Sequence, residues 1–393
     1  MTLKISVEQR RARLARRHCL ASPAGSVVEA ADGVVALHAT DPATVYLSAR
    51  ARRGHSPVGE LEAALYDERA VLRLLGMRRT MFVASREVAA IVQAGCSADV
   101  AVRERRRLEQ HLGTQGHPED LPDPGGWLAE VEESTARALK ARGSATAQQL
   151  SEDEPRLRQQ LLMSKGKPYE SIGNITSRVL LQLAVDGRIV RGRPRGSWIS
   201  SQYHWAPLEG WLPGGLKAWE PGAARVELAR RWLSAYGPAP VADLRWWTGW
   251  TAGQVKKALA ALGPVEVDLD GVPGVVLPED VEPAGRPEPW VALLPGLDPT
   301  PMGWSERGWF LGEHRDALFD RSGNIGPTVW SDGRIVGGWA QRPSGEVAVR
   351  LLEDVGAAAE AAITDESVNL TEWFGEVCVT PRFRTPLERE LSS

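Results

Sequence analysis

The chain has 393 residues and a formal net charge of −3, so it is long enough for two to four domains and is not a uniformly basic binder. Its three cysteines lie far apart without a CxxC pair, which argues against a metal cluster or a disulfide framework and fits a reducing compartment. No apolar stretch reaches the roughly 20 residues that a membrane-spanning helix needs, and no signal peptide is evident, so we expect a cytosolic protein.

A first unit is predicted over residues 1–112. Its pattern indicates several helices with a strand pair among them, which is the content of a winged helix. The N-terminal helix is rich in arginine, and we interpret that face as solvated surface rather than as a binding face. The expected elements are helices over residues 6–20, 27–37, 42–54 and 85–94 and a strand pair over residues 71–83.

Within this unit, polar side chains gather at the start of one helix. An apolar run ends in His38-Ala39-Thr40, and Asp41-Pro42 follows. Asp41 can cap a helix that begins at Pro42, because proline lacks only a donor that has no partner at that position. His38, Thr40 and Asp41 are therefore expected to lie together at one helix N-terminus.

A second unit is predicted over residues 127–208, after a linker at 113–126 that is rich in Gly, Pro and Asp. Three helices are expected, followed by a basic hairpin at residues 188–198. Basic and aromatic side chains crowd this region, enough to neutralise several phosphates and to offer stacking surfaces, so we favour DNA contact over a merely solvated hairpin. The residues expected to bind DNA are Lys165, Lys167, Arg188, Arg191, Arg193, Arg195 and Trp198.

The same plan recurs over residues 222–282, where three helices precede an acidic hairpin. Gly143-Ser144-Ala145-Thr146 and Gly237-Pro238-Ala239-Pro240 open the middle helix of their units, which indicates internal duplication. Residues 286–393 form a last region with short strands at 290–294, 326–330, 334–339 and 347–352 and a helix at 354–365. These strands predict a small β-barrel or sandwich.

Several of these stretches resemble the AlkZ and YcaQ family of winged-helix DNA glycosylases. Residues 37–50 are similar to its first signature, in which an apolar run leads into Gln-x-Gln or Gln-x-Asp, then Asp-Pro and a helix ending in Ala-Arg. The two polar positions of that motif, which are catalytic in the family, fall on His38 and Thr40. Residues 74–82 resemble its Met-Arg-Gly-Thr-Leu-His strand, with Arg79 for glycine and Phe82 for histidine. Further similar stretches are residues 241–249, 293–299 and 333–339.

The resemblance implies an α+β fold of three tandem winged-helix units followed by a small C-terminal β-barrel. It implies a monomeric, monofunctional glycosylase of the bacterial cytoplasm, associated with the nucleoid. Its substrate would be double-stranded DNA that carries an N-alkylated purine or a bulky or crosslinked adduct. His38 is then expected to activate water, Thr40 to position it and Asp41 to support them. We expect no cofactor and no metal, because hydrolysis of the base needs only water.

An alternative interpretation is that the protein binds DNA without catalysing a reaction. Because both glutamine-type positions are changed, the protein is alternatively a catalytically inactive winged-helix DNA-binding or regulatory protein. The sequence leaves open which lesion is the substrate. It also leaves open whether the protein serves general repair or the protection of a producer from its own genotoxin.

Overall fold

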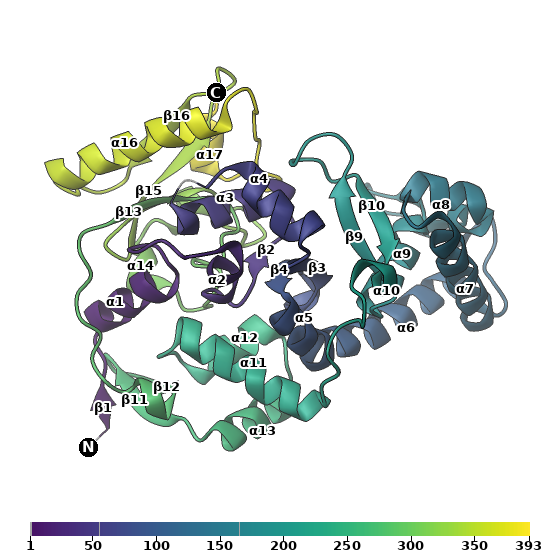
Figure 1. Ribbon diagram of the computed structural model, residues 1–393, viewed down its shortest axis with the longest axis horizontal. Coiled ribbons are helices and arrows are strands. Elements are labelled where there is room, and N and C mark those ends of the chain that lie inside the picture. Colours follow the sequence, from purple (N-terminus) through teal and green to yellow (C-terminus); the bar gives the residue numbers. More distant parts are fainter. Residues whose placement is uncertain (1, 55, 165) are drawn as a thin grey trace.

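The structure, a computed structural model, describes residues 2–54, 56–164 and 166–393 and has a mixed α+β fold (Figure 1). In the first unit, β2, β4 and β3 form an antiparallel sheet in that spatial order. Short π-helical turns extend two of the helices of this unit. Its elements are α1 (Val7–Arg17), α2 (Val27–Asp32), β2 (Leu37–His38), α3 (Pro42–Arg53), α4 (Val58–Glu62), β3 (Val71–Leu75), β4 (Met81–Ser85), α5 (Arg86–Val92) and α6 (Ala98–Thr114).

The second unit has the predicted order of three helices followed by a hairpin, and it projects from the rest of the molecule (Figure 1). The hairpin consists of β9 and β10, and a short strand, β6, pairs with the far edge of β10. A second sheet of β5, β7 and β8 was not predicted, because residues 113–126 and the stretch before residue 175 read as loops. The elements are β5 (Gly116–His117), α7 (Pro124–Arg142), β6 (Ala145–Thr146), α8 (Ala147–Asp153), β7 (Gln160–Met163), β8 (Ser171–Asn174), α9 (Thr176–Val185), β9 (Ile189–Pro194) and β10 (Tyr203–Pro207).

The third unit repeats that order of elements. The last of its three helices begins at Thr251, whose side chain accepts from the Gln254 amide in a capping box. That helix ends at Gly263, which has a left-handed φ of +59° that glycine adopts at little cost. The elements, with the short helix before them, are α10 (Leu208–Trp211), α11 (Pro221–Tyr236), α12 (Val241–Thr248), α13 (Ala252–Leu262), β11 (Val265–Leu269) and β12 (Val272–Val276), and β1 (Leu3–Lys4) pairs with β11 in parallel.

The C-terminal region is an open sheet, and the expectation of a barrel is wrong for the described residues. Four antiparallel strands lie in the order β13, β14, β15 and β16, without pairing between the two outer strands. One long helix, α16, contacts both outer strands and buries Ile363, Leu370 and Phe374, so a helix covers this sheet where a barrel would have closed on itself. The elements are β13 (Val291–Leu294), α14 (Gly308–Leu311), α15 (Arg315–Leu318), β14 (Thr328–Ser331), β15 (Arg334–Gln341), β16 (Val347–Leu351), α16 (Ala357–Phe374) and α17 (Pro386–Leu391).

Two large hydrophobic cores, beside three small clusters among the described residues, divide the molecule unequally. One contiguous core joins the first unit, the third unit and the C-terminal region. The second unit has a core of its own, to which Leu108 and Leu112 at the end of α6 also belong. The predicted boundary at residue 112 therefore falls inside a helix whose end packs with the second unit. The four domain boundaries themselves stay predictions.

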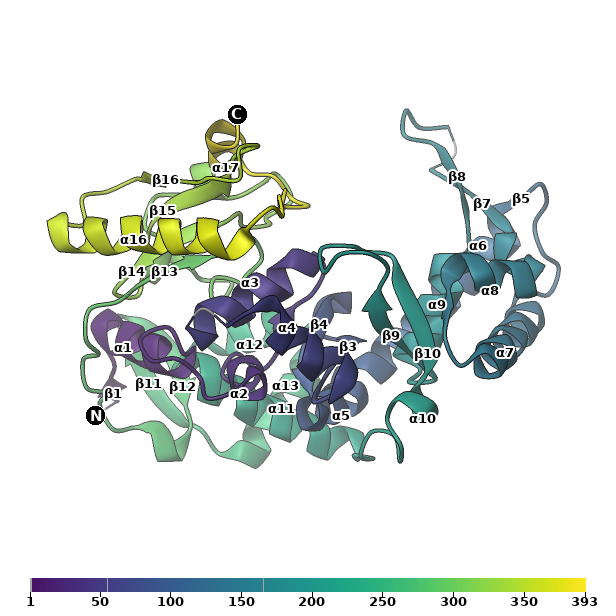
Figure 2. The ribbon, with the colours of Figure 1, turned by 45° about the horizontal axis from the view of Figure 1, so that its top comes forward.

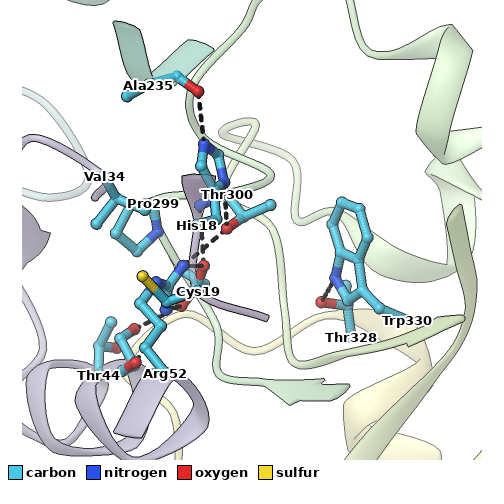
Figure 3. A network of polar contacts seen from close by, with 12 residues as sticks. His18, Cys19, Val34, Thr44, Arg52, Ala235, Pro299, Thr300, Thr328 and Trp330 are labelled. Atoms are coloured by element: carbon cyan, nitrogen blue, oxygen red, sulfur yellow. Dashed lines mark hydrogen bonds and ion pairs between the residues drawn. The ribbon is translucent and has the colours of Figure 1, made fainter. Parts of the chain in front are cut away.

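A buried polar network crosses the large core (Figure 3). The guanidinium of Arg52 on α3 donates to both carboxylate oxygens of Asp298, at 2.9 and 2.7 Å, and neither side chain is exposed. Ser48 donates to the same carboxylate at 2.6 Å. Arg52 also donates to the hydroxyl of Thr300 at 2.7 Å. Every charge removed from water is thus met by an opposite charge or a hydrogen bond.

The network continues to the first and third units through His18. Its Nε2 lies 3.1 Å from the carbonyl oxygen of Ala235 on α11, and its Nδ1 lies 2.9 Å from the Thr300 hydroxyl. Because a carbonyl only accepts, Nε2 carries the proton and Nδ1 accepts from Thr300. Burial, together with the positive charge of Arg52, lowers the pKa of His18 to about 3, so the ring is neutral. Three parts of the chain are therefore tied together by one set of buried polar contacts, in which the Nε of Arg52 is left without a partner among the described residues.

Replacing Asp298 with alanine should destabilise the protein by about 3–5 kcal/mol, because the Arg52 guanidinium is left buried without its counter-charge. Denaturant unfolding measures this loss. A matched control is Glu390→Ala, which removes the partner of Arg350 in an exposed ion pair and should cost less than about 1 kcal/mol. Equal losses in the two variants would show that the buried network does not hold the fold.

Candidate functional site

A cleft of about 480 Å³ lies where three parts of the chain meet. The start of α3 contributes Ala39, Thr40 and Pro42, and the C-terminal segment contributes Arg382. Figure 2 shows the loop between β9 and β10 reaching from the second unit towards α3. The lining residues of the second unit are Thr146, Ala147, Gln148, Ser177, Leu180, Arg191, Arg195, Ser201, Gln202, Tyr203 and Trp205.

Asp41 has the capping role that the sequence predicts. Its Oδ1 accepts from the Ala43 amide at 3.1 Å, and Pro42 occupies the first turn of α3. Its Oδ2 accepts from the Arg382 amide at 2.9 Å. Both carboxylate oxygens are thus engaged with backbone, and no hydrogen bond within the described residues links Asp41 to His38. The support that Asp41 gives to the motif is structural.

Thr40 lies in the lining of the cleft and is half-buried. Among the described residues, its hydroxyl makes no hydrogen bond to another protein group. A hydroxyl in this position can accept from and donate to a water molecule in the cleft. Of the two motif positions, Thr40 is the one that the structure brings to the cleft.

His38 lies outside the cleft lining and is only 5% exposed. It pairs with Phe82 across β2 and β4, and the two rings meet edge to face with their centroids 5.6 Å apart. Its buried Nδ1 has no hydrogen-bond partner among the described residues. Burial, and then the positive charge of Arg78, lower the pKa of His38 to about 3. His38 is therefore neutral near pH 7 and a weak base.

The turn beside His38 carries backbone strain. Arg78 and Arg79 have φ values of +52° and +59°, a region in which glycine is favoured. Arg79 stands where the resembling motif has glycine. The guanidinium of Arg78 lies 3.8 Å from the ring centroid of Trp246, a cation–π contact that fixes its position in the turn. This contact holds a positive charge close to His38.

Two of the predicted DNA-binding arginines line the cleft. Arg191 stacks over Tyr203 and Trp205, with 5.4 and 5.2 Å from the guanidinium carbon to the ring centroids, and burial lowers its pKa. Arg195 is exposed, and among the described residues its side chain forms no ion pair. These two side chains supply positive charge on the side of the cleft that the hairpin forms.

The other predicted DNA-binding cations lie elsewhere. Arg193 pairs with Glu62 at 2.9 Å and Asp67 at 3.2 Å, and Arg188 pairs with Glu133 at 2.8 Å. Lys167 is exposed in the loop between β7 and β8, away from the cleft lining, and Lys165 lies outside the described residues.

The prediction that Trp198 offers a stacking surface to DNA is wrong, because the side chain is buried. It is 8% exposed and packs 4.9 Å from Tyr46 on α3 and 5.6 Å from Trp373 on α16, measured between ring centroids. The tip of the hairpin needs an apolar anchor where it meets the first unit, and Trp198 provides it. Its role is therefore to position the hairpin.

Sequence reasoning missed Arg382 entirely. It stands in a C-terminal tail, 341 residues from its partner Asp41, and no spacing or motif links the two. Within the described residues, no group of three or more His, Cys, Asp and Glu side chains is arranged to hold a metal ion. None of the described helices is both long and apolar enough to cross a membrane.

The family model described as DNA glycosylase AlkZ-like matches residues 31–373. The chain belongs to the AlkZ-like DNA glycosylase family. A curated relative from Streptomyces sahachiroi, named interstrand DNA cross-link repair glycosylase, is 30% identical over 170 residues, which are 41% of this chain and 45% of the relative. The aligned stretch thus spans less than half of that relative.

A solved structure, the Streptomyces sahachiroi DNA glycosylase AlkZ, has a similar fold, with a TM-score of 0.73 over 94% of this chain and 98% of that chain, at 21% identity. The family resemblance inferred from the motif is confirmed. In this AlkZ-like chain, Thr40 lines the cleft and His38 does not.

Acid should destabilise this AlkZ-like protein partly through His38. Its pKa falls from an ordinary 6.5 to about 3 on folding, so its stabilising effect is complete above pH 6.5 and is lost as the pH drops from 6.5 towards 3. Between pH 7 and pH 5 the free energy of unfolding should fall by about 2 kcal/mol through this residue alone. In His38→Asn, which does not titrate there, that share of the loss should disappear.

Urea unfolding of both proteins at the two pH values measures the difference, in which contributions from other groups, including His18, cancel. The same pH dependence in both proteins would contradict a buried neutral imidazole at position 38.

Proposed function

We propose that the protein is a monofunctional DNA glycosylase that hydrolyses the N-glycosidic bond of N-alkylated purines, at N7 or N3, or of bulky or crosslinked adducts in duplex DNA. The observation that carries this proposal is the position of Thr40. It is a polar position of the family motif, and it lies in an open cleft lined by arginines. The relative named as an interstrand cross-link repair glycosylase supports the substrate class.

Hydrolysis of the glycosidic bond of an alkylated purine needs little catalytic assistance from the protein. Alkylation at purine N7 or N3 makes the base cationic and a good leaving group, so catalysis consists mainly of positioning water and tolerating positive charge on the sugar. Thr40 is proposed to hold the attacking water. A protonated histidine would oppose the positive charge that develops on the sugar, but the low pKa keeps His38 neutral. Because His38 is buried outside the cleft lining and is a weak base, we propose only a minor part for it in activating water.

DNA binding is proposed to follow from the arrangement of the units. The second and third units have the element order of winged helices, and we propose that these units and the first hold a duplex along the face where the cleft opens. Arg191 and Arg195 on the hairpin would contact phosphates near the lesion. A bulky or crosslinked base is not easily swung into a closed pocket, so an open cleft suits such lesions. We propose that the protein acts as a monomer in the bacterial cytoplasm.

The first test is release of 7-methylguanine from methylated duplex DNA. Thr40→Val, which removes the hydroxyl at nearly constant shape, should slow release by roughly 10²-fold, because the water loses its positioning group. Thr40→Ser keeps the hydroxyl and serves as the matched control, with most of the activity retained. His38→Ala should have a smaller effect. If Thr40→Val released base as fast as the wild type, the hydroxyl would have no role.

A second candidate function is favoured by the position of His38. One of the two motif positions lies outside the cleft, so the chain is alternatively a DNA-binding or regulatory protein without catalysis. Absence of release from both methylated and crosslinked duplexes, with DNA binding that weakens as salt rises, would establish this alternative. Release that depends on Thr40 would exclude it.

Arg195 and Arg193 form a matched pair for DNA binding, since they stand two residues apart on one hairpin and differ in their ion pairs. Arg195→Ala should weaken binding and reduce the slope of log K against log salt by about 0.9, the share of one phosphate. Arg193→Ala should change the slope less, because Glu62 and Asp67 already neutralise that guanidinium. Fluorescence anisotropy over a salt series measures both slopes, and the reverse order would contradict the assignment.

A further inference from the structure

The C-terminal segment of residues 376–385 connects α16 to α17 and passes Asp41 at the start of α3. Gln341 on β15 holds its first part, since its Oε1 accepts from the Val379 amide at 2.7 Å and its Nε2 donates to the Val377 carbonyl at 3.0 Å. Asp41 holds the next part, because its Oδ2 accepts from the Arg382 amide at 2.9 Å. The segment is thus held at two points by side chains of the folded body.

Arg382 is the residue that this arrangement places at the cleft. Its backbone is bound, while its side chain is exposed and contributes to the cleft lining. Among the described residues, no carboxylate pairs with its guanidinium. The nearest aromatic contact is to Phe383, at 5.8 Å from the ring centroid. An unpaired guanidinium held by its backbone beside Thr40 is suited to bind a phosphate.

The charge of Arg382 comes from a different part of the chain than that of Arg191 and Arg195. Those two side chains belong to the hairpin of the second unit, whose core is separate, whereas Arg382 belongs to the C-terminal region. Positive charge therefore reaches the cleft from two different parts of the chain. The match to the family model ends at residue 373, so Arg382 lies outside the matched residues.

We propose that Arg382 binds a DNA phosphate at the glycosylase site, and that Asp41 positions it through the backbone hydrogen bond; this inference rests on the proposed function. Arg382 and the hairpin arginines then hold the strand from two sides of Thr40. Asp41 acts as a positioning residue, since it caps α3 with one oxygen and fixes Arg382 with the other.

The experiment compares DNA affinity across salt concentrations and base release for the full-length wild type, Arg382→Ala and Arg382→Lys. In Arg382→Ala the slope of log K against log salt should fall by about 0.9, so that the loss of affinity between 50 and 200 mM salt shrinks about 3.5-fold. Lysine should restore most of the slope, because it keeps the charge. Arg389→Ala, an exposed and unpaired arginine of α17 among the described residues, is the matched control and should behave as the wild type.

Asp41→Asn tests the positioning step. Asparagine caps a helix as well as aspartate does. Its amide has one acceptor oxygen and one NH₂ group, so the two side-chain ends cannot both accept, one from the Ala43 amide and the other from the Arg382 amide. This variant should keep its thermal stability near that of the wild type and should reproduce the reduced salt slope of Arg382→Ala. An unchanged slope in Asp41→Asn would overturn the positioning role.

The outcomes separate this inference from the function on which it rests. Wild-type protein that binds DNA and releases base, with Arg382→Ala indistinguishable from it, overturns the inference alone. Weaker binding in Arg382→Ala without a change in slope, not rescued by lysine, shows a structural role and also overturns it. Wild-type protein that neither binds duplex DNA nor releases base overturns the proposed function itself.

Discussion

The buried ion pair between Arg52 and Asp298 is the contact on which the candidate site depends. Arg52 lies near the end of α3, the helix whose N-terminus carries Thr40, and Asp298 lies in the loop that follows β13. Both charged groups are buried, so moving the Arg52 guanidinium away from the Asp298 carboxylate would leave each charge without its partner in the core. The pair therefore fixes α3 relative to the C-terminal sheet. The same constraint sets the distance between the motif and the C-terminal segment that contributes Arg382.

The cleft combines this rigid body with a second unit that has a separate core. Apart from the chain connections, the hairpin loop links the two at the cleft. Trp198 packs on Tyr46 and Trp373, and Arg193 pairs with acidic residues of the first unit. Trp198 and Arg193, which the sequence predicts to bind DNA, therefore hold the hairpin against the rest of the molecule. A residue that anchors the hairpin by burial cannot also stack on a base, so positioning and binding are divided among neighbours on one hairpin.

Most local elements were predictable from the sequence, and the long-range arrangements were not. The cap at Asp41 and the helix after Thr251 follow from residue types that satisfy backbone donors locally. The strands of the C-terminal region were also found, but their closure into a barrel was wrong, because alternation along a strand does not say whether a helix such as α16 covers the sheet. In the candidate site, the motif was predicted from the sequence. The burial of His38 and the position of Arg382 in the cleft lining were not, because both depend on contacts between distant segments.

The environment of His38 constrains the chemistry that this site supports. Its imidazole lies against Phe82 and near the positive charge of Arg78, and both effects favour the neutral ring. A histidine that stays neutral has no proton to give to a departing base, and the Thr40 hydroxyl positions water without acting as a base, so the proton of the attacking water is released to solvent. The proposed reaction therefore relies on the substrate to supply most of the driving force. Alkylated purines meet this requirement, because their positive charge weakens the glycosidic bond before the protein acts. If the proposed function holds, the altered motif favours cationic lesions over unmodified bases, because unmodified bases leave poorly.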